Sequence, residues 1–402
     1  MKTLTETAHP AAVRRVAARL AESRTASILT DLVRTRSQNP VDGEASAGAY
    51  IATFLEPLGL EVTMQEVFPE RANVVGRLRG AGGGGRTLAF NTHTDTVPEG
   101  TGWTREPFGG EIVDGNLYGR GSADAKGPLA AFLAAIEAIV SSGVRLRGDL
   151  LMTAVVDEET ASAGARKLVP TLSADLALVG EPTSMQVGIA HRGSLRPLVV
   201  VNGRTAHSSR PEQGVNAIYQ SIPVLQAFID YAARIHDRSH PLCGSASAAV
   251  TMMSAGVAEN VIPGRCELTL DRRMVPGEVE TDVIAEIEAM IAEIGASKAG
   301  VEVGIERFLA TTGSASELEP DHPLVALAVD CATAATGKPA EIIGLSGACD
   351  MTHFRAKGIP CVVLGPGDSA QAHQPDEHIS VRELNEGALA YVLVALGACG
   401  LE

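Results

Sequence analysis

Hydrophobic and polar positions along this chain follow two different periods. Apolar residues recur at helical spacing in five stretches, which predicts amphipathic helices. These stretches are residues 11–34, 46–58, 126–140, 322–336 and 380–398. Short continuous apolar runs, typical of buried strands, lie at residues 61–67, 73–79, 87–92, 149–156, 175–180 and 361–365. Because strands and helices alternate, the pattern predicts an α/β fold with a mostly parallel central sheet.

A different rhythm between residues 191 and 309 predicts a second domain. Its elements follow the order β-α-β-β-α-β, which is that of ferredoxin-like domains. The apolar stripe of the first helix in this domain consists of Ile218, Ile222, Leu225, Ile229 and Ala232. The α/β pattern resumes at residue 310. We therefore expect a catalytic domain built from residues 1–190 and 310–402, with a ferredoxin-like α+β domain inserted at 191–309.

Composition excludes several classes of protein. The 402 residues carry a net charge of −15, and no basic patch suited to a phosphate backbone is visible, so nucleic acid is not an expected partner. The chain has no apolar run long enough to span a membrane, and its N-terminal residues lack a continuous apolar stretch, so no signal peptide is expected. The six cysteines are scattered without a C-x-x-C pair, which favours reduced thiols in a cytoplasmic protein.

Carboxylates and histidines follow several of the strand-like runs. The stretch "TAVVDEETASAG" at residues 153–164 places a cluster of acids directly after a buried strand. Similar residues occur in "NTHTDT", "GRGSADAKG", "GEPT" and "AHQPDE". Each element alone also fits a hydrogen-bond pair or a helix cap. Because parallel strands present their carboxyl ends at one edge, we expect the elements to converge there. Buried acids and imidazoles need a compensating positive charge, so the sequence predicts a zinc site.

These motifs resemble those of a known enzyme family. In chain order they are "NTHTDTVP", "YGRGSADAKG", "DEETASAG", "GEPT", "DRRMVPGE" and "AHQPDE", and they extend over most of the sequence. They look like the dinuclear zinc amidohydrolases and exopeptidases, which include acetylornithine deacetylase, succinyl-diaminopimelate desuccinylase, aminoacylase and glutamate carboxypeptidase. The resemblance implies a zinc-exopeptidase-like catalytic domain and makes the inserted domain a lid and dimerisation domain. It also implies a homodimer with two Zn²⁺ per chain, for which Co²⁺ or Mn²⁺ could substitute.

The resemblance also assigns roles to residues of the catalytic domain. The implied metal ligands are His93, Asp124, Glu159, Glu181 and His373. Asp124 would bridge the two ions, with His93 and Glu181 on one ion and the other two ligands on the second. Asp95 would hydrogen-bond the far nitrogen of His93 and fix its tautomer. The resemblance also makes Glu158 the general base. Neighbours on an extended chain point opposite ways, so Glu159 could face a metal while Glu158 faces the metal-bound water.

Further residues are implied by resemblance in and near the inserted domain. His207 in "NGRTAHSS" would donate a hydrogen bond to the reaction oxyanion in the other subunit of the dimer. The implied clamp on the substrate carboxylate consists of Asn260, Arg273 and Gly347. A guanidinium binds a carboxylate bidentately, and the adjacent Arg272 is the alternative to Arg273. Asp350 occupies a position where the family has a recurring Asp, and we expect a structural role for it.

The expected reaction is hydrolysis of the amide bond of an N-acyl amino acid. Desuccinylases carry extra basic residues before the "RGS" element, whereas here only Arg192 is basic. This difference favours a small, neutral acyl group, with acetyl as the leading candidate. A dipeptidase or carboxypeptidase of the same family is the first alternative. A catalytically silent binding protein is the second, and the presence of all five ligand positions and the base argues against it.

Overall fold

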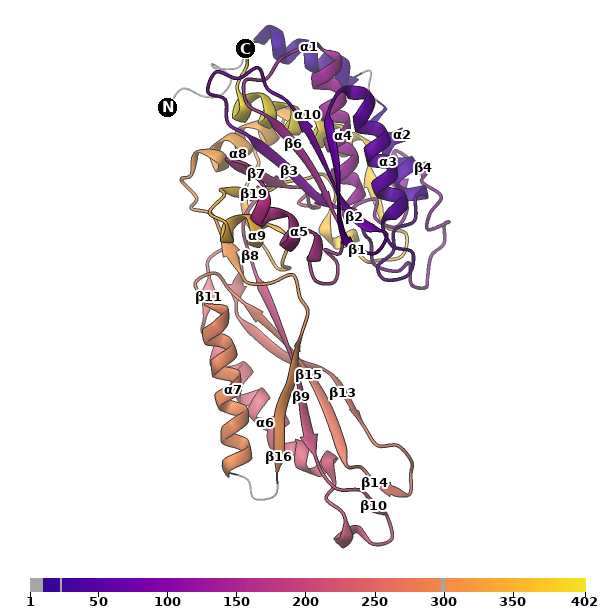
Figure 1. Cartoon of the computed structure of the whole chain (residues 1–402), viewed down its shortest axis with the longest axis vertical. Coiled ribbons are helices and arrows are strands. Elements are labelled where there is room, and N and C mark those ends of the chain that lie inside the picture. The colour runs from indigo at the N-terminus through magenta and orange to yellow at the C-terminus, as the bar shows by residue number, and fades with distance from the viewer. Residues whose placement is uncertain (1–9, 22–23, 298–300) are drawn as a thin grey trace. The chain divides into compact units, whose positions relative to one another are not determined.

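The computed structural model describes residues 10–21, 24–297 and 301–402 (Figure 1). The chain separates into two compact units. The first comprises the described residues of Met1–Ile189, Glu317–Ile343 and Cys349–Glu402, and the second comprises those of Ala190–Ser316 and Gly344–Ala348. The domain boundaries expected at residues 190/191 and 309/310 stay a prediction.

A nine-stranded sheet forms the centre of the first unit. Its strands are β1 (Glu61–Phe68), β2 (Arg71–Leu78), β3 (Leu88–His93), β6 (Leu150–Val155), β7 (Leu176–Val179), β8 (Val187–His191), β17 (Ser316–Glu317), β18 (Ile342–Leu345) and β19 (Cys361–Val363). The order is β1-β2-β6-β3-β7-β19-β8-β17, and β18 also pairs with β8. The central strands β6, β3, β7 and β19 are parallel. The predicted α/β fold with a mostly parallel central sheet is therefore confirmed.

Helices cover this sheet (Figure 1). They are α1 (Pro10–Ala21), α2 (Thr25–Arg34), α3 (Ala45–Leu55), α4 (Lys126–Ser141), α5 (Ala163–Leu168), α8 (Pro323–Thr336), α9 (Met351–Ala356) and α10 (Val381–Cys399). Helix α10 packs against α4 and α8. The helical-period stretch at residues 11–34 contains two helices. The chain forms α1 and α2 there, because Arg24 has non-helical dihedral angles of φ −98° and ψ 41°, and residues 22–23 lie outside the described part.

The core of the first unit lies around α4. This helix is apolar on almost all sides, and a helix of that kind is stable only when neighbours cover it completely. The ring of Phe132 on α4 stacks on Phe90 of β3 at a centroid distance of 4.5 Å and on Tyr391 of α10 at 4.1 Å. The Tyr391 hydroxyl donates a 2.8 Å hydrogen bond to the Leu364 carbonyl. This packing supports β3, the strand that ends at His93.

The second unit contains a four-stranded antiparallel sheet and two long helices. They are β9 (Gly193–Asn202), α6 (Ala217–Ile235), β13 (Ser247–Ala255), β15 (Arg265–Met274), α7 (Glu280–Ser297) and β16 (Glu302–Leu309). The strand order is β13-β15-β9-β16, and residues 298–300 lie outside the described part. The predicted β-α-β-β-α-β order is confirmed.

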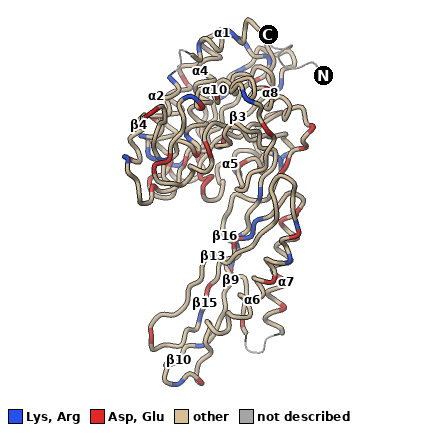
Figure 2. Tube along the Cα trace, turned by 180° about the vertical axis from the view of Figure 1, so that it is seen from behind, with Lys and Arg blue, Asp and Glu red and all other residues tan. Residues whose placement is uncertain are grey.

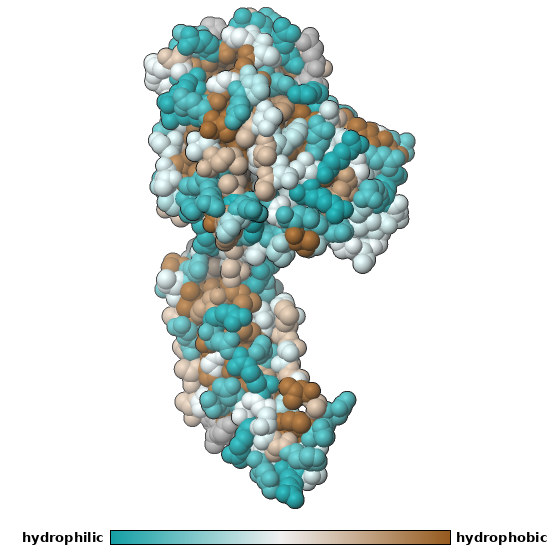
Figure 3. Space-filling model, turned by 45° about the vertical axis from the view of Figure 1, so that its right-hand side comes forward, coloured by the Kyte–Doolittle hydropathy of each residue, from teal (hydrophilic) through white to brown (hydrophobic). Residues whose placement is uncertain are grey.

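Helix α6 turns a different face to the core than its sequence pattern indicated. Val224, Phe228 and Tyr231 are buried against the sheet and α7. In contrast, Ile222 and Ile229 of the predicted stripe are 61% and 62% exposed. The helix carries apolar residues on two faces, so periodicity alone cannot choose between them. Figure 3 shows hydrophobic residues at the surface of this unit.

Short strands form a three-stranded sheet in the first unit and two strand pairs in the second. They are β4 (Glu111–Val113), β5 (Asn116–Tyr118) and β20 (His378–Ser380) in the first unit, and β10 (Ala206–His207), β11 (Ser239–His240), β12 (Gly244–Ser245) and β14 (Val261–Ile262) in the second. Along the trace in Figure 2, Lys and Arg are interspersed with Asp and Glu in both units. Among the helices of the described residues, none has the length and apolar character needed to cross a membrane.

Candidate metal centre

The register of the parallel strands brings the predicted ligands to one edge of the sheet. His93 at the end of β3 pairs with Val155 at the end of β6, and Asn91 pairs with Val179 at the end of β7. The segments that follow β6 and β7 therefore leave the sheet beside His93. They carry Glu158, Glu159 and Glu181, which is how residues distant in sequence come together.

The first group of ligand atoms surrounds the buried ring of His93. Its Nε2 atom lies 3.1 Å from Asp124 Oδ1 and 3.9 Å from Glu181 Oε2. Asp124 lies just before α4, and Glu181 lies two residues after β7. These three residues are the set that the resemblance assigns to one ion.

The second group surrounds His373. Its Nε2 atom lies 3.0 Å from Glu159 Oε2 and 3.5 Å from Asp124 Oδ2. The two oxygens of Asp124 therefore face different imidazoles. Ligand atoms of His93, Asp124 and Glu159 all lie within 4.8 Å of one another, close enough to hold a metal ion, and this set includes residues of both groups.

The electrostatics of this edge fit a bound cation. Burial raises the pKa of Glu158 and of Glu181 well above the usual range, and the charges of neighbouring carboxylates raise both further. Burial by itself lowers the pKa of His93, but its contact with Asp124 and the other carboxylates raises it well above 6.5. Glu158 Oε1 is buried and has no hydrogen-bond partner among the described residues. A divalent ion would balance this excess of buried negative charge.

Asp95 contacts the site differently from what the resemblance implied. His93 Nδ1 lies 2.9 Å from the backbone oxygen of Asp95 and 3.6 Å from its carboxylate, so the hydrogen bond goes to the backbone. The carboxylate instead accepts hydrogen bonds from the backbone N–H groups of Glu158, at 3.1 Å, and Glu159, at 3.2 Å. Asp95 thus holds the backbone of the paired acids.

The paired acids do not lie on an extended strand. Strand β6 ends at Val155, Asp157 has a positive φ of 69°, and Glu158 and Glu159 lie in a turn. The strand alternation used to separate their directions is therefore wrong. The turn, held by Asp95, separates them instead.

Three residues outside every motif support this turn. Asn39 Nδ2 donates to Asp95 at 3.2 Å and to Asp157 at 2.9 Å. Arg71 forms ion pairs with Glu44 and with Asp157, the latter at 3.2 Å. The Glu44 carboxylate also accepts from the Asp157 N–H at 3.1 Å. Sequence reasoning missed Asn39, Glu44 and Arg71, since nothing in their local pattern distinguishes them from ordinary surface polar residues.

Asp350 is buried beneath the same edge. Its Oδ2 accepts a 2.9 Å hydrogen bond from Asn91, whose own oxygen accepts from Thr153 at 2.9 Å. These bonds connect the start of α9 to β3 and β6. The contacts agree with the structural role expected for Asp350.

Two of the implied substrate residues meet in the second unit. Strands β10 and β14 pair His207 with Val261, and the Ser208 N–H donates to the Asn260 carbonyl at 2.9 Å. His207 Nδ1 accepts from the Ser209 N–H at 3.1 Å. Because a backbone N–H only donates, this bond places the proton of the neutral imidazole on Nε2.

The two candidate arginines occupy opposite faces of β15. Arg272 is fully buried on the helix side, where it contacts Tyr231 at 3.0 Å and pairs with Glu278. Arg273 is partly exposed on the other face and pairs with Asp271 at 2.6 Å. Arg272 is thus committed to the core of the second unit. Gly347 is exposed, and a Cβ there would meet no other described heavy atom within 4 Å.

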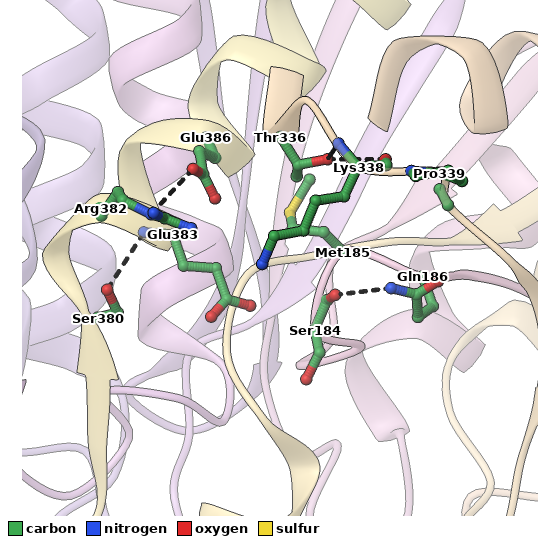
Figure 4. Close-up of a pocket in the computed structure, with 11 residues that line it drawn as sticks. Ser184, Met185, Gln186, Thr336, Lys338, Pro339, Ser380, Arg382, Glu383 and Glu386 are labelled. Carbon is green, nitrogen blue, oxygen red and sulfur yellow. Dashed lines mark hydrogen bonds and ion pairs between the residues drawn. The ribbon is translucent and has the colours of Figure 1, made fainter. Parts of the chain in front are cut away.

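A separate hollow of about 520 Å³ lies elsewhere on the first unit and contains none of the predicted ligands (Figure 4). Its charged residues largely bond within the protein. Arg382 pairs with Glu386 at 3.1 Å, and Glu383 accepts from the Gly367 N–H at 3.0 Å.

Comparison with known proteins decides the family. Residues 89–397 match the model of peptidase family M20/M25/M40. The chain belongs to this family. This M20 chain is 34% identical to the acetylornithine deacetylase of Salmonella arizonae over 364 aligned residues. The alignment covers 89% of this chain and 92% of the relative. The resemblance inferred from the motifs is confirmed, and so is the prediction of a hydrolase.

Solved structures share the M20 fold. A metallo-carboxypeptidase from Sulfolobus solfataricus superposes with a TM-score of 0.77 at 18% identity, covering 94% of this chain and 99% of that one. A dipeptidase from Saccharomyces cerevisiae gives 0.75 at 16% identity, with 95% and 98% covered. At these identities the likeness shows the fold alone. The family assignment therefore establishes an amidohydrolase or peptidase, and the substrate needs separate support.

Proposed function

We propose that this M20 hydrolase cleaves the amide bond of N-acyl amino acids, with N-acetyl amino acids as the preferred class. The observation that carries the proposal is the position of Asp124. Its Oδ1 lies 3.1 Å from His93 and its Oδ2 lies 3.5 Å from His373, as a carboxylate shared by two ions requires. The cytoplasmic location that we propose rests on the spacing of the cysteines.

The proposed ions are two Zn²⁺ per chain, with Co²⁺ or Mn²⁺ as alternatives. The ligands would be His93, Asp124, Glu159, Glu181 and His373. Imidazole nitrogens mixed with carboxylate oxygens suit zinc. The buried Oε1 of Glu158 has no hydrogen-bond donor among the described residues, which also fits a nearby cation. Bound ions would supply Lewis acidity and lower the pKa of a coordinated water toward about 7.

Glu158 is the proposed general base. Its backbone is held by Asp95, while its carboxylate keeps one oxygen without a hydrogen bond among the described residues. It would accept the proton of the attacking water and return it to the leaving amine. Glu159 cannot share this task, because its carboxylate contacts His373.

His207 is the proposed donor to the oxyanion. Ser209 donates to its Nδ1, so the proton lies on Nε2, which would be the donor to the oxyanion. In our proposal it reaches the active site of the partner subunit of a homodimer. The exposed residues Ile222 and Ile229 on α6 support association through the second unit, since burying such a surface favours a dimer.

The proposed clamp on the substrate carboxylate uses Asn260, Arg273 and the backbone at Gly347. Between the two arginines, burial of Arg272 favours Arg273. Residues 188–191, just before the "RGS" element, include no Lys or Arg, and the Nε of Arg192, the first residue of that element, already donates to the Cys243 carbonyl at 2.8 Å. This arrangement supports a neutral acyl group, as does similarity to an acetylornithine deacetylase.

A hydrolysis screen tests the proposed substrate class. Purified protein supplied with Zn²⁺ is assayed against N-acetyl, N-succinyl and N-formyl derivatives of the same amino acids and against dipeptides. We expect kcat/KM for the best N-acetyl substrate to exceed that for its N-succinyl counterpart and for dipeptides by about tenfold or more. A preference for dipeptides would instead assign the chain to the peptidases of the family.

The split ligand set predicts a specific effect of His373→Ala. The wild-type protein should bind two divalent ions per chain, and the variant should bind one of them much more weakly while retaining the other. The reason is that His373 contacts Glu159 and Asp124 but belongs to one group only. Elemental analysis combined with titration against a chelator measures both affinities. Equal weakening of both ions would contradict the division of ligands.

A further inference from the structure

A buried carboxylate outside the ligand set binds the loop that carries Asp124. Glu377 Oε1 accepts from the N–H groups of Ala123, at 2.9 Å, and Asp124, at 3.0 Å. Its Oε2 accepts from the Gly121 N–H at 3.0 Å and from the guanidinium of Arg120. The Glu377 side chain is completely buried. One carboxylate thus satisfies four donors of a five-residue segment.

This loop depends on an outside acceptor. It precedes α4 and belongs to no helix or strand, so its amides lack regular partners. Gly121 has a φ of +82°, and a Cβ there would lie 2.6 Å from Thr96 Cγ2. The backbone conformation of this loop therefore tolerates little change, and the Glu377 carboxylate accepts hydrogen bonds from the amides that have no partner in a helix or strand.

The same short segment carries a proposed ligand of the second ion. His373 lies four residues before Glu377, and Asp376 between them accepts from Thr104 N–H at 2.9 Å and from its hydroxyl at 2.7 Å. In addition, the Glu377 carbonyl accepts from the Gly119 N–H at 2.8 Å. The segment 373–377 is thus attached to the loop of Asp124 through the Glu377 side chain, to Gly119 just before that loop through the Glu377 carbonyl, and to Thr104 through Asp376.

We infer that Glu377 is a positioning residue that sets the placement of Asp124 between the two groups of metal ligands. It touches no ion and no substrate in this scheme, and it acts through the backbone of residues 120–124. The inference rests on the proposed two-metal site. Because the positioned carboxylate faces both groups, its displacement should weaken both ions, unlike the loss of His373.

Glu377→Gln tests this role. The amide keeps the shape of the side chain, but its NH₂ group must face two of the four donors, which breaks those hydrogen bonds and sets donor against donor. We expect both ions to bind about 10–100-fold more weakly, the usual cost of losing an outer partner of a metal ligand. Excess metal should restore much of the lost activity. Competition with a chelator, well below the unfolding temperature, measures the affinities.

Asp149→Asn is the matched control. Asp149 also joins an arginine to a backbone amide, accepting from Arg77 at 2.6 Å and Gly80 N–H at 2.8 Å. It precedes β6 and so lies at the opposite edge of the sheet from the ligands. We expect this variant to lose thermal stability but to bind both ions as the wild type does.

Several results would overturn the inference. They are unchanged metal affinity in folded Glu377→Gln, weakening of one ion only, or equal weakening in Asp149→Asn. Should Glu377→Gln fail to fold, as judged by near-UV circular dichroism, the same titration of Glu377→Asp decides. That variant keeps the charge but is too short to reach all four donors, and unchanged affinity in it overturns the inference.

The inference and the proposed function fail separately. Wild-type protein that binds two ions but hydrolyses no N-acyl amino acid refutes the proposed substrate, while weak binding by Glu377→Gln still supports the inference. Conversely, an active wild type whose Glu377→Gln variant binds both ions normally keeps the function and refutes the inference. A wild type that binds no divalent ion refutes both.

Discussion

Replacing Glu158 with alanine should lower kcat by about 10²–10⁴-fold, the range typical for loss of a general base, while both ions stay bound. One oxygen of the Glu158 carboxylate, Oε1, is buried and has no hydrogen-bond partner in the described chain. Removing it should therefore cost proton transfer and leave the ligands in place. Stopped assays with the best N-acyl substrate measure kcat, and elemental analysis measures the metal.

Glu158→Gln is the closest control for shape. The amide fills the same volume but cannot accept the proton of the attacking water, so it should be as slow as the alanine variant. A rate near that of the wild type would remove Glu158 from the chemistry.

The neighbouring Glu159 supplies the opposite control. Its carboxylate lies 3.0 Å from His373, and Glu159→Ala should lose metal together with activity. Two variants with the same metal content would show that the paired acids do not divide their tasks as proposed.

Mixing His207→Ala with Glu158→Ala should restore activity that neither variant has alone. If His207 acts in the partner's site, a mixed dimer combines native Glu158 from one chain with native His207 from the other at one of its two sites. Random subunit exchange makes about half of the dimers mixed. About a quarter of native activity should return, because half of the dimers then have one working site of two. The background should be low, since removing one oxyanion donor typically costs about 10²–10³-fold in kcat.

Subunit exchange must be demonstrated independently, by mass spectrometry of differently labelled chains. A mixture of His207→Ala with wild type is the control, because its subunits exchange in the same way but its activity does not depend on two variants complementing each other. Absence of recovery despite full exchange would place His207 in the site of its own chain or outside catalysis.

The pattern of the sequence was sufficient for six strands of the sheet and for the edge that carries the site, whereas β8, β17 and β18 were not predicted. Short apolar runs at residues 87–92, 149–156 and 175–180 are typical of buried strands, and they form β3, β6 and β7. Carboxylates and histidines directly after such runs must lie at the carboxyl edge once the strands are parallel. Local periodicity also determined the β-α-β-β-α-β order of the second unit, since each element there has its own period.

The sequence did not determine which face of a strand or helix packs against the core when both faces fit the pattern. Strand alternation places Arg272 and Arg273 on opposite sides of β15, but only the packing of α6 on the sheet buried Arg272 against Tyr231. For the same reason periodicity named the stripe of Ile222 and Ile229 on α6, while the sheet contacts Val224 and Phe228. Both faces of this helix are apolar enough to satisfy the pattern.

Contacts between distant segments were decided by tertiary structure alone. Asn39 reaches Asp95 and Asp157 across 56 and 118 residues, and Glu377 reaches the loop of Asp124 across 253. No local period encodes such pairs, because they depend on where loops end after the sheet has formed. The sequence thus determined which residues could bind metal, and the fold decided which side chains hold those residues in place.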